Sequence, residues 1–235
     1  MDGAGRSPLL KACRVVGQEA VTLKTHPWRM EDEKPLLQKV RGMFAQIVGA
    51  ASPDDIAIMP STSYAISTAA RNVSMARGQC ALVLEQQMAS NVMPWQDLCR
   101  RCGGELLVVP RPPDSDWTGA ILESLRTLRR KVAVVALPNC HWTDGSLIDL
   151  RRVAEACQLY EVPLVLDVTQ SAGVMPLDVS ELKPAFLACS VHKWLYGLYG
   201  FSLVYVDPRY HATWQPLEHF ERNREGSDQP EWDEK

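Results

Sequence analysis

The sequence predicts an α/β fold in which a mostly parallel sheet is flanked by helices. Short apolar runs alternate along the chain with longer segments of helical periodicity, which is the pattern of repeated β–α–β units. The apolar runs are nearly continuous, as expected for strands that helices cover on both faces. In such sheets ligands bind beyond the carboxyl ends of the strands, so polar residues there are the first candidates for a site.

The predicted elements follow one another in this alternating order. Apolar runs predict strands over residues 54–60, 80–85, 104–110, 131–138, 162–168, 186–190 and 201–206. Amphipathic segments predict helices over residues 34–50, 61–73, 91–102, 118–130 and 147–160. In the first of these helices Leu36, Leu37, Val40, Met43, Phe44, Ile47 and Val48 can share one face. Gly49 is its predicted stop, and Thr118 is a predicted N-cap.

Composition and charge describe an ordinary globular protein. The chain has 235 residues, of which 46% are hydrophobic and 23% charged, with a net charge of −3. This balance gives no indication of a nucleic-acid or membrane partner. No apolar run approaches the length of a membrane span, and the N-terminus lacks the pattern of a signal peptide. A cytoplasmic location is therefore expected.

The cysteines do not indicate a disulfide scaffold or a metal site. Their number, seven, is odd, and they are scattered along the chain. Cys99 and Cys102 form a C-x-x-C, which precedes two glycines and is therefore expected at the end of a helix, not at the helix start that a redox site uses. No second cysteine pair completes a zinc site, so no metal is expected.

Two predicted strands end in residues that suit a charged ligand. Thr62 and Ser63 follow the first strand at the start of a helix, where free N–H groups and hydroxyls bind phosphate; a plain N-cap is the alternative. Asp167 ends the buried strand over residues 162–168 and needs a cationic or hydrogen-bonding partner; a structural cap is its alternative. Gln170 follows on the same rim.

A third strand end places an amine beside two anion donors. Ser190 and His192 can donate hydrogen bonds to an anion, and Lys193 directly follows them. A buried ammonium is costly unless it is paired or neutralised. Lys193 is therefore a candidate nucleophilic amine, with a salt-bridged surface lysine as the alternative reading.

Together these strand ends supply an anion cradle, an acid and an amine. Pyridoxal phosphate requires all three, because it has a phosphate, a pyridine nitrogen that becomes cationic beside a carboxylate, and an aldehyde that condenses with lysine. No G-x-G-x-x-G or P-loop motif competes for the phosphate.

The motifs DVTQSAG at residues 167–173 and SVHKW at residues 190–194 resemble the class V aminotransferase, or cysteine-desulfurase-like, family of fold type I pyridoxal-phosphate enzymes. The separation of Asp167 from Lys193 lies in the range that the family uses. Weaker likenesses are DGAGRSPL at residues 2–9, STSYAISTAARNV at residues 61–73 and LEQQMASNVMPWQ at residues 84–96. The resemblance implies a pyridoxal-phosphate-dependent large domain and a homodimer.

The resemblance also implies a role for each matching residue. Lys193 forms the Schiff base, Asp167 pairs with the pyridinium nitrogen, and Gln170 binds the phenolic oxygen of the ring. The phosphate is held by Thr62, Ser63, Ser190 and His192. Asn139 matches an asparagine near the same oxygen or the substrate, although CHWTDG at residues 140–145 departs from the family pattern. His141 or Trp142 is the alternative lining of the substrate pocket.

The sequence departs from the family in two further ways. Met88 falls where many members stack a histidine or another aromatic ring on the cofactor; a thioether can pack there but cannot carry a proton. Family members also continue well past the lysine into a C-terminal domain, and desulfurases carry their sulfur-accepting cysteine beyond the lysine. Here all seven cysteines precede Lys193. The expected organisation is an N-terminal helical segment and substrate-approach loop over residues 1–50, a cofactor-binding large domain over 51–210, and over 211–235 a polar tail that begins a missing C-terminal part.

Three functions remain open at this point. The first is a pyridoxal-phosphate-dependent enzyme acting on an amino acid, of the aminotransferase or C–S/elimination lyase type; a desulfurase of the usual mechanism is disfavoured by the cysteine positions. The second is a catalytically incomplete large domain that serves as a cofactor-binding or dimerisation module. The third is a phosphate-binding α/β domain of another kind, which has no use for Asp167 and Lys193 together.

Overall fold

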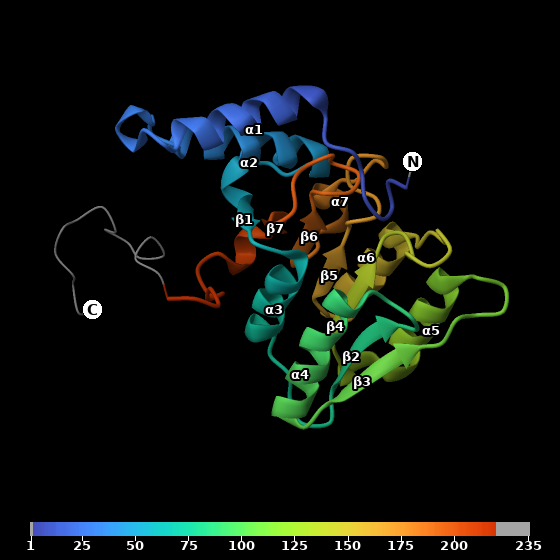
Figure 1. Cartoon of the computed structure of the whole chain (residues 1–235). Helices are drawn as coiled ribbons and strands as arrows, with labels where there is room; N and C mark the ends of the chain where they lie inside the picture. The colour runs from blue at the N-terminus through green and yellow to red at the C-terminus, as the bar shows by residue number, and fades with distance from the viewer. Residues whose placement is uncertain (1, 220–235) are drawn as a thin grey trace, which may run out of the picture.

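A computed structural model gives the fold of residues 2–219 (Figure 1). Within these residues the centre is a seven-stranded sheet in the order β1-β7-β6-β5-β4-β2-β3. The strands are β1 (Ile56–Met59), β2 (Cys80–Leu84), β3 (Glu105–Val109), β4 (Val132–Pro138), β5 (Leu164–Asp167), β6 (Phe186–Ser190) and β7 (Ser202–Val206). Strands β2 to β6 are parallel, and β7 is antiparallel to both of its neighbours. The predicted fold class is confirmed.

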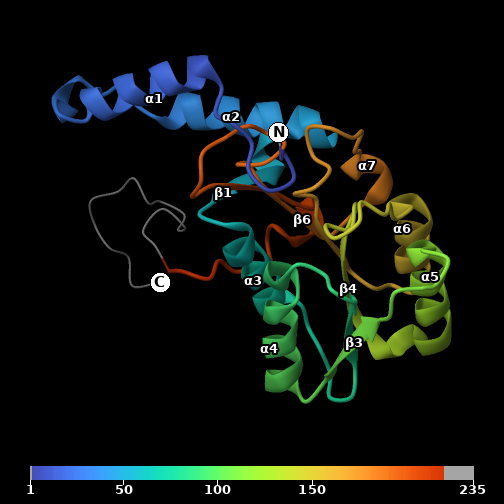
Figure 2. The ribbon, with the colours of Figure 1, turned by 45° about the vertical axis from the view of Figure 1, so that its right-hand side comes forward.

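Helices cover both faces of the sheet (Figures 1 and 2). They are α1 (Lys11–Leu23), α2 (Lys34–Val48), α3 (Thr62–Asn72), α4 (Met93–Cys102), α5 (Trp117–Leu128), α6 (Leu150–Leu159) and α7 (Val179–Leu182). Residues of α3 and α4 share one apolar core with the sheet, and residues of α2, α5, α6 and α7 share the other. Strand side chains alternate between the two cores, so Val83 faces α3 and α4 while Leu82 and Leu84 face α5 and α6.

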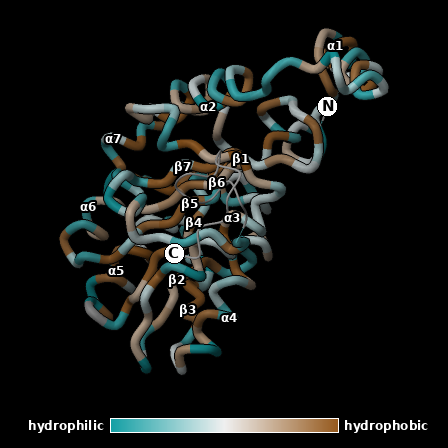
Figure 3. The backbone as a smooth tube through the Cα atoms, turned by 90° about the vertical axis from the view of Figure 1, so that its left-hand side faces the viewer, coloured by the Kyte–Doolittle hydropathy of each residue, from teal (hydrophilic) through white to brown (hydrophobic). Residues whose placement is uncertain are grey.

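The apolar strands lie in the middle of the molecule, and hydrophilic turns lie outside them (Figure 3). Trp95 and Trp117 are both fully buried, one in each core. Because the strands are covered on both faces, their carboxyl ends are the edge at which the chain can present polar groups to a ligand.

Helices α1 and α2 form an N-terminal hairpin that extends beyond the sheet (Figure 2). Helix α1 falls in the expected N-terminal helical segment over residues 1–50, although no separate helix was predicted there, and it buries none of its residues. The expectation of one apolar face on α2 is only partly met, because Phe44 and Val48 are buried whereas Leu36 and Met43 are 64% and 56% exposed. Helix α2 meets β1 and β7 along a narrow side, so its other apolar side chains stay outside.

Two predicted helix ends are confirmed and one is wrong. Gly49 ends α2 with a φ of 71°, a left-handed conformation that glycine adopts without strain. Cys102 is the last residue of α4, as expected for the C-x-x-C. Thr118 does not cap α5: the cap is Asp116, whose Oδ1 accepts from Gly119 N at 2.9 Å. Thr118 lies inside the helix, and its Oγ1 accepts from Asp149 N at 3.0 Å.

Other sequence expectations concern partners and boundaries. All seven cysteines are free thiols. In the part of the chain that the structure describes, no helix combines the length and the apolar character needed to cross a bilayer. The predicted tail over residues 211–235 lies largely outside the described residues, which end at 219. The domain boundaries remain predictions.

Candidate active site

A cavity of about 250 Å³ lies beyond the carboxyl ends of β4, β5 and β6, beside the start of α3. Seven of its lining residues are candidates from the sequence: Thr62, Met88, Asp167, Gln170, Ser190, His192 and Lys193. Seven others also line it: Gln87, Ser90, Asn91, Pro138, Cys140, Trp142 and Thr169. The fold therefore brings together side chains from positions 62 to 193 of the chain.

Asp167 is the acid of this cavity. It is the last residue of β5 and is buried, and its Oδ1 accepts a hydrogen bond from Thr169 N at 3.0 Å. Burial raises the pKa of Asp167, while the Thr169 hydrogen bonds and the charge of Lys193 oppose that rise. A buried carboxylate with this little compensation is suited to receive a cationic ligand.

Lys193 is the amine of the cavity, in the segment that follows β6. Its side chain makes no hydrogen bond or ion pair with any of residues 2–219, although its charge is felt by Asp167 and His192. A hydrogen bond holds the segment in place next to Lys193, because Trp194 Nε1 donates to Gln170 Oε1 at 2.8 Å. The amine is therefore held near the acid without being neutralised by it.

Hydroxyl groups form the wall between α3 and β6. Thr62 Oγ1 and Ser190 Oγ are 2.6 Å apart, and Ser190 N donates to Thr169 Oγ1 at 3.0 Å. Thr62 is the first residue of α3, and Ser61 caps that helix by accepting from Tyr64 N. The cradle thus combines hydroxyl donors with a helix N-terminus, whose partial positive charge favours an anion.

His192 closes the same side of the cavity. Its ring stacks on Tyr199 with centroids 4.3 Å apart. Burial and then the charge of Lys193 lower the pKa of His192 below its usual 6.5. At neutral pH the imidazole is therefore uncharged and offers one N–H donor.

The first residues of the chain reach this site. Gln170 Nε2 donates to Ala4 O at 3.0 Å, and Ser7 N donates to His192 O at 3.4 Å. The approach of residues 2–9 to the site is an expectation from the resemblance, and these contacts agree with it.

Two candidate residues from the sequence do not line the cavity. The hydroxyl of Ser63 lies 3.0 Å from that of Ser61, on the outer side of the helix start. Asn139 is buried, and its Nδ2 donates to Ile148 O at 3.4 Å. Of the two alternatives to Asn139, Trp142 lines the cavity, whereas His141 is fully buried behind it.

The sequence analysis missed two buried amides in the loop after β2. Gln87 Nε2 donates to Asn91 O and to Ala136 O, which ties this loop to β4. Asn91 accepts from Trp95 Nε1 at 3.1 Å, while its own Nδ2 is buried without a hydrogen-bond partner among the described residues. Their position just after a strand end was the available signal, in the same segment that contains Met88.

One cysteine also lines the cavity, which shows that a position before Lys193 in sequence does not exclude a thiol from the site. That residue is Cys140, directly after β4 and Asn139. Burial raises the pKa of its thiol, so it is protonated at neutral pH and is not a ready nucleophile.

Comparison with known proteins identifies the family. The sequence profile of "Aminotransferase class-V" matches residues 21–224. The chain belongs to this family. A cysteine desulfurase from Escherichia coli O6:K15:H31 (strain 536 / UPEC) is 29% identical over 177 residues, which are 72% of this chain and 42% of the relative. The uncharacterized aminotransferase YcbU of Bacillus subtilis (strain 168) is 25% identical and covers 80% of this chain and 48% of its own. The chain thus spans less than half the length of these curated relatives.

Solved structures show the same fold. The apo structure of a cysteine desulfurase from Thermococcus onnurineus NA1 aligns with a TM-score of 0.78 at 20% identity, over 92% of this chain and 55% of that one. A mutant of C-DES, with glycine covalently linked to its PLP cofactor, aligns with a TM-score of 0.77 at 18% identity, over 92% of this chain and 58% of that one.

The residues of the cavity fit pyridoxal phosphate. The buried Asp167 lacks an ion-pair partner within residues 2–219, which suits a pyridinium nitrogen. The amine of Lys193 is likewise unpaired and suits an aldehyde. The cradle of Thr62 and Ser190 at the start of α3 suits a phosphate. Each group of the cofactor therefore has a side chain of matching chemistry in the cavity.

Proposed function

We propose that this chain is part of a pyridoxal-phosphate-dependent enzyme that acts on an amino acid. The observation that carries the proposal is a buried carboxylate and an unpaired amine in one cavity, beside a hydroxyl cradle at a helix N-terminus. When bound, pyridoxal phosphate supplies an aldehyde that condenses with amines and a ring that withdraws electrons from the α-carbon of the substrate.

In this proposal Lys193 is the residue that bonds the cofactor covalently. Its Nζ lies in the cavity, where it would also move a proton at the α-carbon of a bound substrate. Asp167 holds the ring nitrogen in its protonated form, because a cation beside a buried carboxylate favours the ionised state of both. These two residues are the proposed catalytic pair.

The other predicted contacts take supporting roles. Thr62, Ser190 and the neutral His192 donate hydrogen bonds to the phosphate. Gln170 and Met88 line the cavity and remain the predicted contacts of the phenolic oxygen and the ring face. Asn139 and Ser63, which lie outside the lining, are the least supported of the predicted cofactor contacts.

The reaction is proposed only as a class, either amino-group transfer or elimination with C–S cleavage. The relatives include cysteine desulfurases and an aminotransferase, and the lining residues do not choose between them. A non-catalytic cofactor-binding or dimerisation module is the second candidate. It is favoured by the absence of any arginine from the described lining, since such a site needs a cation for the substrate carboxylate.

We further propose that the chain forms a homodimer in the cytoplasm, as expected from the sequence. The support is the N-terminal hairpin, on which Val16, Val21 and Trp28 are 63%, 74% and 75% exposed. Exposed large apolar side chains that gather on one element are typical of interaction surfaces. Light scattering after size-exclusion chromatography tests the dimer, and a monomer at micromolar concentration contradicts it.

The first experiment adds pyridoxal phosphate to the purified chain, reduces the mixture with borohydride and maps the labelled peptide. We expect an absorption band of the bound cofactor and a label on Lys193. Lys193→Ala should abolish the label, whereas Lys39→Ala, at an exposed position of α2, should retain it. A label that survives Lys193→Ala contradicts the proposal. Turnover of an amino acid by the labelled protein distinguishes the enzyme from the non-catalytic module.

A further inference from the structure

Trp142 lies at the cavity in a defined position. It follows β4 by four residues, lines the cavity and remains 49% exposed. Its indole Nε1 donates to Gln86 O at 2.7 Å, and Gln86 has a left-handed φ of 55°. The indole is therefore anchored at its polar end, and its apolar face is free for a ligand.

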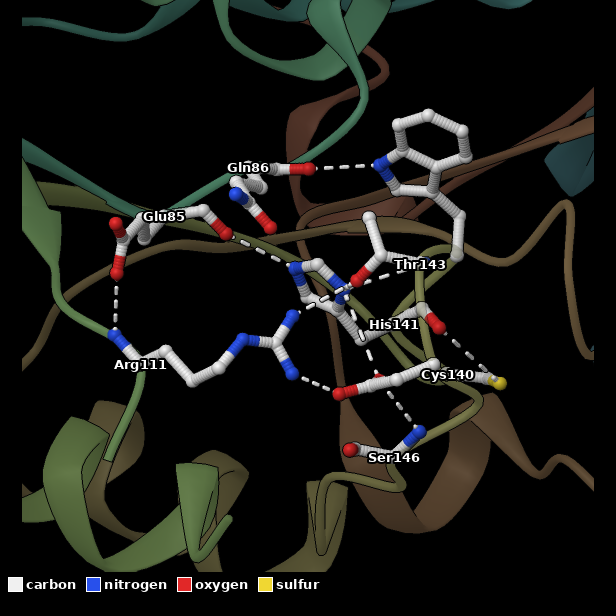
Figure 4. Close-up of polar contacts among 9 residues, drawn as sticks. Glu85, Gln86, Arg111, Cys140, His141, Thr143 and Ser146 are labelled. Atoms are coloured by element: carbon white, nitrogen blue, oxygen red, sulfur yellow. Dashed lines mark hydrogen bonds and ion pairs between the residues drawn. The ribbon is translucent and has the colours of Figure 1, made fainter. Parts of the chain in front are cut away.

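A paired cluster around the residues that flank Trp142, the latch, consists of Glu85, Arg111, His141 and Thr143, which are labelled in Figure 4, together with Asp144. The guanidinium of Arg111 pairs with Asp144 and donates to Thr143 Oγ1 at 2.8 Å. The backbone N of Arg111 donates to Glu85 Oε2 at 2.7 Å. The latch thus joins the segments that follow β2, β3 and β4.

His141 is the centre of the latch. Its ring is fully buried, with Nε2 3.0 Å from Glu85 O and Nδ1 2.8 Å from Thr143 Oγ1. It stacks on Trp117 with centroids 5.1 Å apart and planes at 7°, and Arg111 lies over the same Trp117 ring. Burial and the charge of Arg111 lower the pKa of His141, so its ring packs in the latch as a neutral group.

The loop that bears Trp142 is closed on itself. The backbones of Cys140 and Leu147 form an isolated antiparallel β-bridge, and His141 N donates to Ser146 O at 2.8 Å. Gly145 completes the turn with a φ of 76°. Since residues 140–147 form a closed turn fixed by the latch, the indole is held in one place at the cavity, as selective recognition requires.

The surroundings of the indole select for an apolar ligand group. The charged side chains of the described lining are Asp167 and Lys193, which the proposed function assigns to the cofactor. Of the other lining residues on the segments after β2 and β4, Met88, Pro138 and Cys140 are apolar or carry a protonated thiol, and Gln87, Ser90 and Asn91 are uncharged. A carboxylate on the substrate side chain would meet the negative face of an indole and no cation.

We propose that Trp142 contacts an apolar side chain of the amino-acid substrate, and that the latch determines substrate selectivity by holding Trp142 in place. This proposal rests on the proposed function, because it needs the cofactor in the same cavity. Trp142 is the specificity residue, and Arg111, His141 and Asp144 are positioning residues.

The test uses reduced phosphopyridoxyl derivatives of leucine and aspartate, which carry cofactor and substrate together and bind without reacting. Titration calorimetry measures the dissociation constant of each with the full chain. We expect the leucine derivative to bind more tightly than the aspartate derivative. Trp142→Ala should weaken the leucine derivative about tenfold and leave the aspartate derivative within about twofold. Trp142→Phe should retain most of the preference.

The latch is tested with Asp144→Asn, and the matched control is Glu123→Gln, which removes an exposed ion pair with Arg126 on α5. Asp144→Asn should reduce the leucine preference at least threefold and shift the emission of Trp142 to longer wavelength, measured by subtracting the spectrum of the same variant carrying Trp142→Phe. Glu123→Gln should change neither quantity.

The outcomes separate the two proposals. One outcome overturns only the specificity role of Trp142. In it, pyridoxal phosphate and both derivatives bind, and Trp142→Ala leaves the preference for the leucine derivative unchanged. A lysine derivative that binds better than the leucine derivative and loses this advantage in Trp142→Ala assigns the indole to a cation and overturns the apolar assignment. If neither the cofactor nor any derivative binds, the proposed function and this inference both fail.

Discussion

Two charged clusters lie at the same edge of the sheet and differ in how they are paired. In the latch, Arg111 contacts Asp144, Thr143 and the ring of Trp117. In the cavity, Asp167 and Lys193 lie near each other, yet the amine has no hydrogen bond or ion pair within residues 2–219. The charges of the latch are paired without a ligand, whereas the amine of Lys193 in the cavity is not.

This difference distinguishes charged residues that stabilise the fold from charged residues that are available to bind a ligand. A buried polar group without a partner costs stability, so a fold retains one only where something else compensates. The latch needs nothing further and connects three loops. The cavity carries a carboxylate whose pKa is raised by burial and an amide, Asn91 Nδ2, without a partner. A charged residue at a strand end therefore indicates a ligand site only where the structure leaves its charge unpaired.

The largest expected effect comes from Asp167→Asn. Without its carboxylate, the cavity should bind pyridoxal phosphate about 100-fold more weakly, since a hydrogen bond to a charged group contributes about 1.5–3 kcal/mol. The unfolding free energy of the cofactor-free chain should not fall, because the variant no longer buries a carboxylate. Fluorescence titration measures the affinity, and urea unfolding measures the stability.

The same variant has a pH signature. The folded pKa of Asp167 is raised above its usual 3.8. The folded state therefore holds the proton more tightly, and stability from this group is present at low pH and lost as pH rises through the folded pKa. The stability of Asp167→Asn relative to the cofactor-free wild type should increase from pH 4 to pH 8. A variant less stable than wild type at both ends of this range would show that the carboxylate is a structural partner.

The next effect comes from Gly173→Ala, which disturbs the support of Lys193. Gly173 has a φ of 92°, and a Cβ there would lie 2.7 Å from Leu195 Cδ2 and 3.1 Å from Trp194 O. We expect a loss of about 2–3 kcal/mol in unfolding free energy, together with slower labelling of Lys193 by cofactor and borohydride.

Gly200→Ala is the matched control for this change. Its φ is 88°, but nothing lies within 4 Å of the added Cβ. Gly200→Ala should lose about 1 kcal/mol of unfolding free energy, from the backbone conformation alone. Its Lys193 should be labelled at the wild-type rate. Equal losses in both variants would mean that contact with residues 194 and 195 is unimportant.

The smallest effect distinguishes the paired cluster from an ordinary surface pair. Arg111→Gln removes a half-buried guanidinium and should lower the unfolding free energy by about 1–2 kcal/mol without changing cofactor affinity. Arg126→Gln removes an exposed i,i+3 pair with Glu123 and should leave the denaturation midpoint unchanged. A loss of cofactor affinity in Arg111→Gln would extend the role of the latch from the substrate mouth to the cofactor itself.

The sequence predicted those parts of the site that depend on local rules. Asp167, Ser190 and Thr62 each stand at the end of a strand or the start of a helix, and parallel strands bring such ends together. The rule fails within one turn of helix, because Thr62 faces the cavity while Ser63, the next residue, is rotated to the outside. Periodicity alone does not give that rotation.

Other parts could not be predicted because they depend on strand order. Glu85 meets Arg111 because β2 pairs with β3, and Arg111 reaches Asp144 across the end of β2, which lies between β3 and β4. The sequence pattern indicates that strands exist but does not order them. No separate helix was predicted for α1, although its apolar periodicity is as marked as that of the core helix α5. It buries no residue against the described fold, so burial gives no further signal for it.

The place of β1 in the sheet has a consequence for how the chain is made. Within residues 2–219, strand β1 is an edge strand whose one neighbour is β7, with Ile56 opposite Tyr205. During synthesis from the amino end, this apolar strand leaves the ribosome long before its partner exists. Pairing between segments so distant in sequence forms slowly, and an unpaired apolar edge invites association with other chains. The segment that forms β1 is therefore open to association with other chains until β7 has emerged.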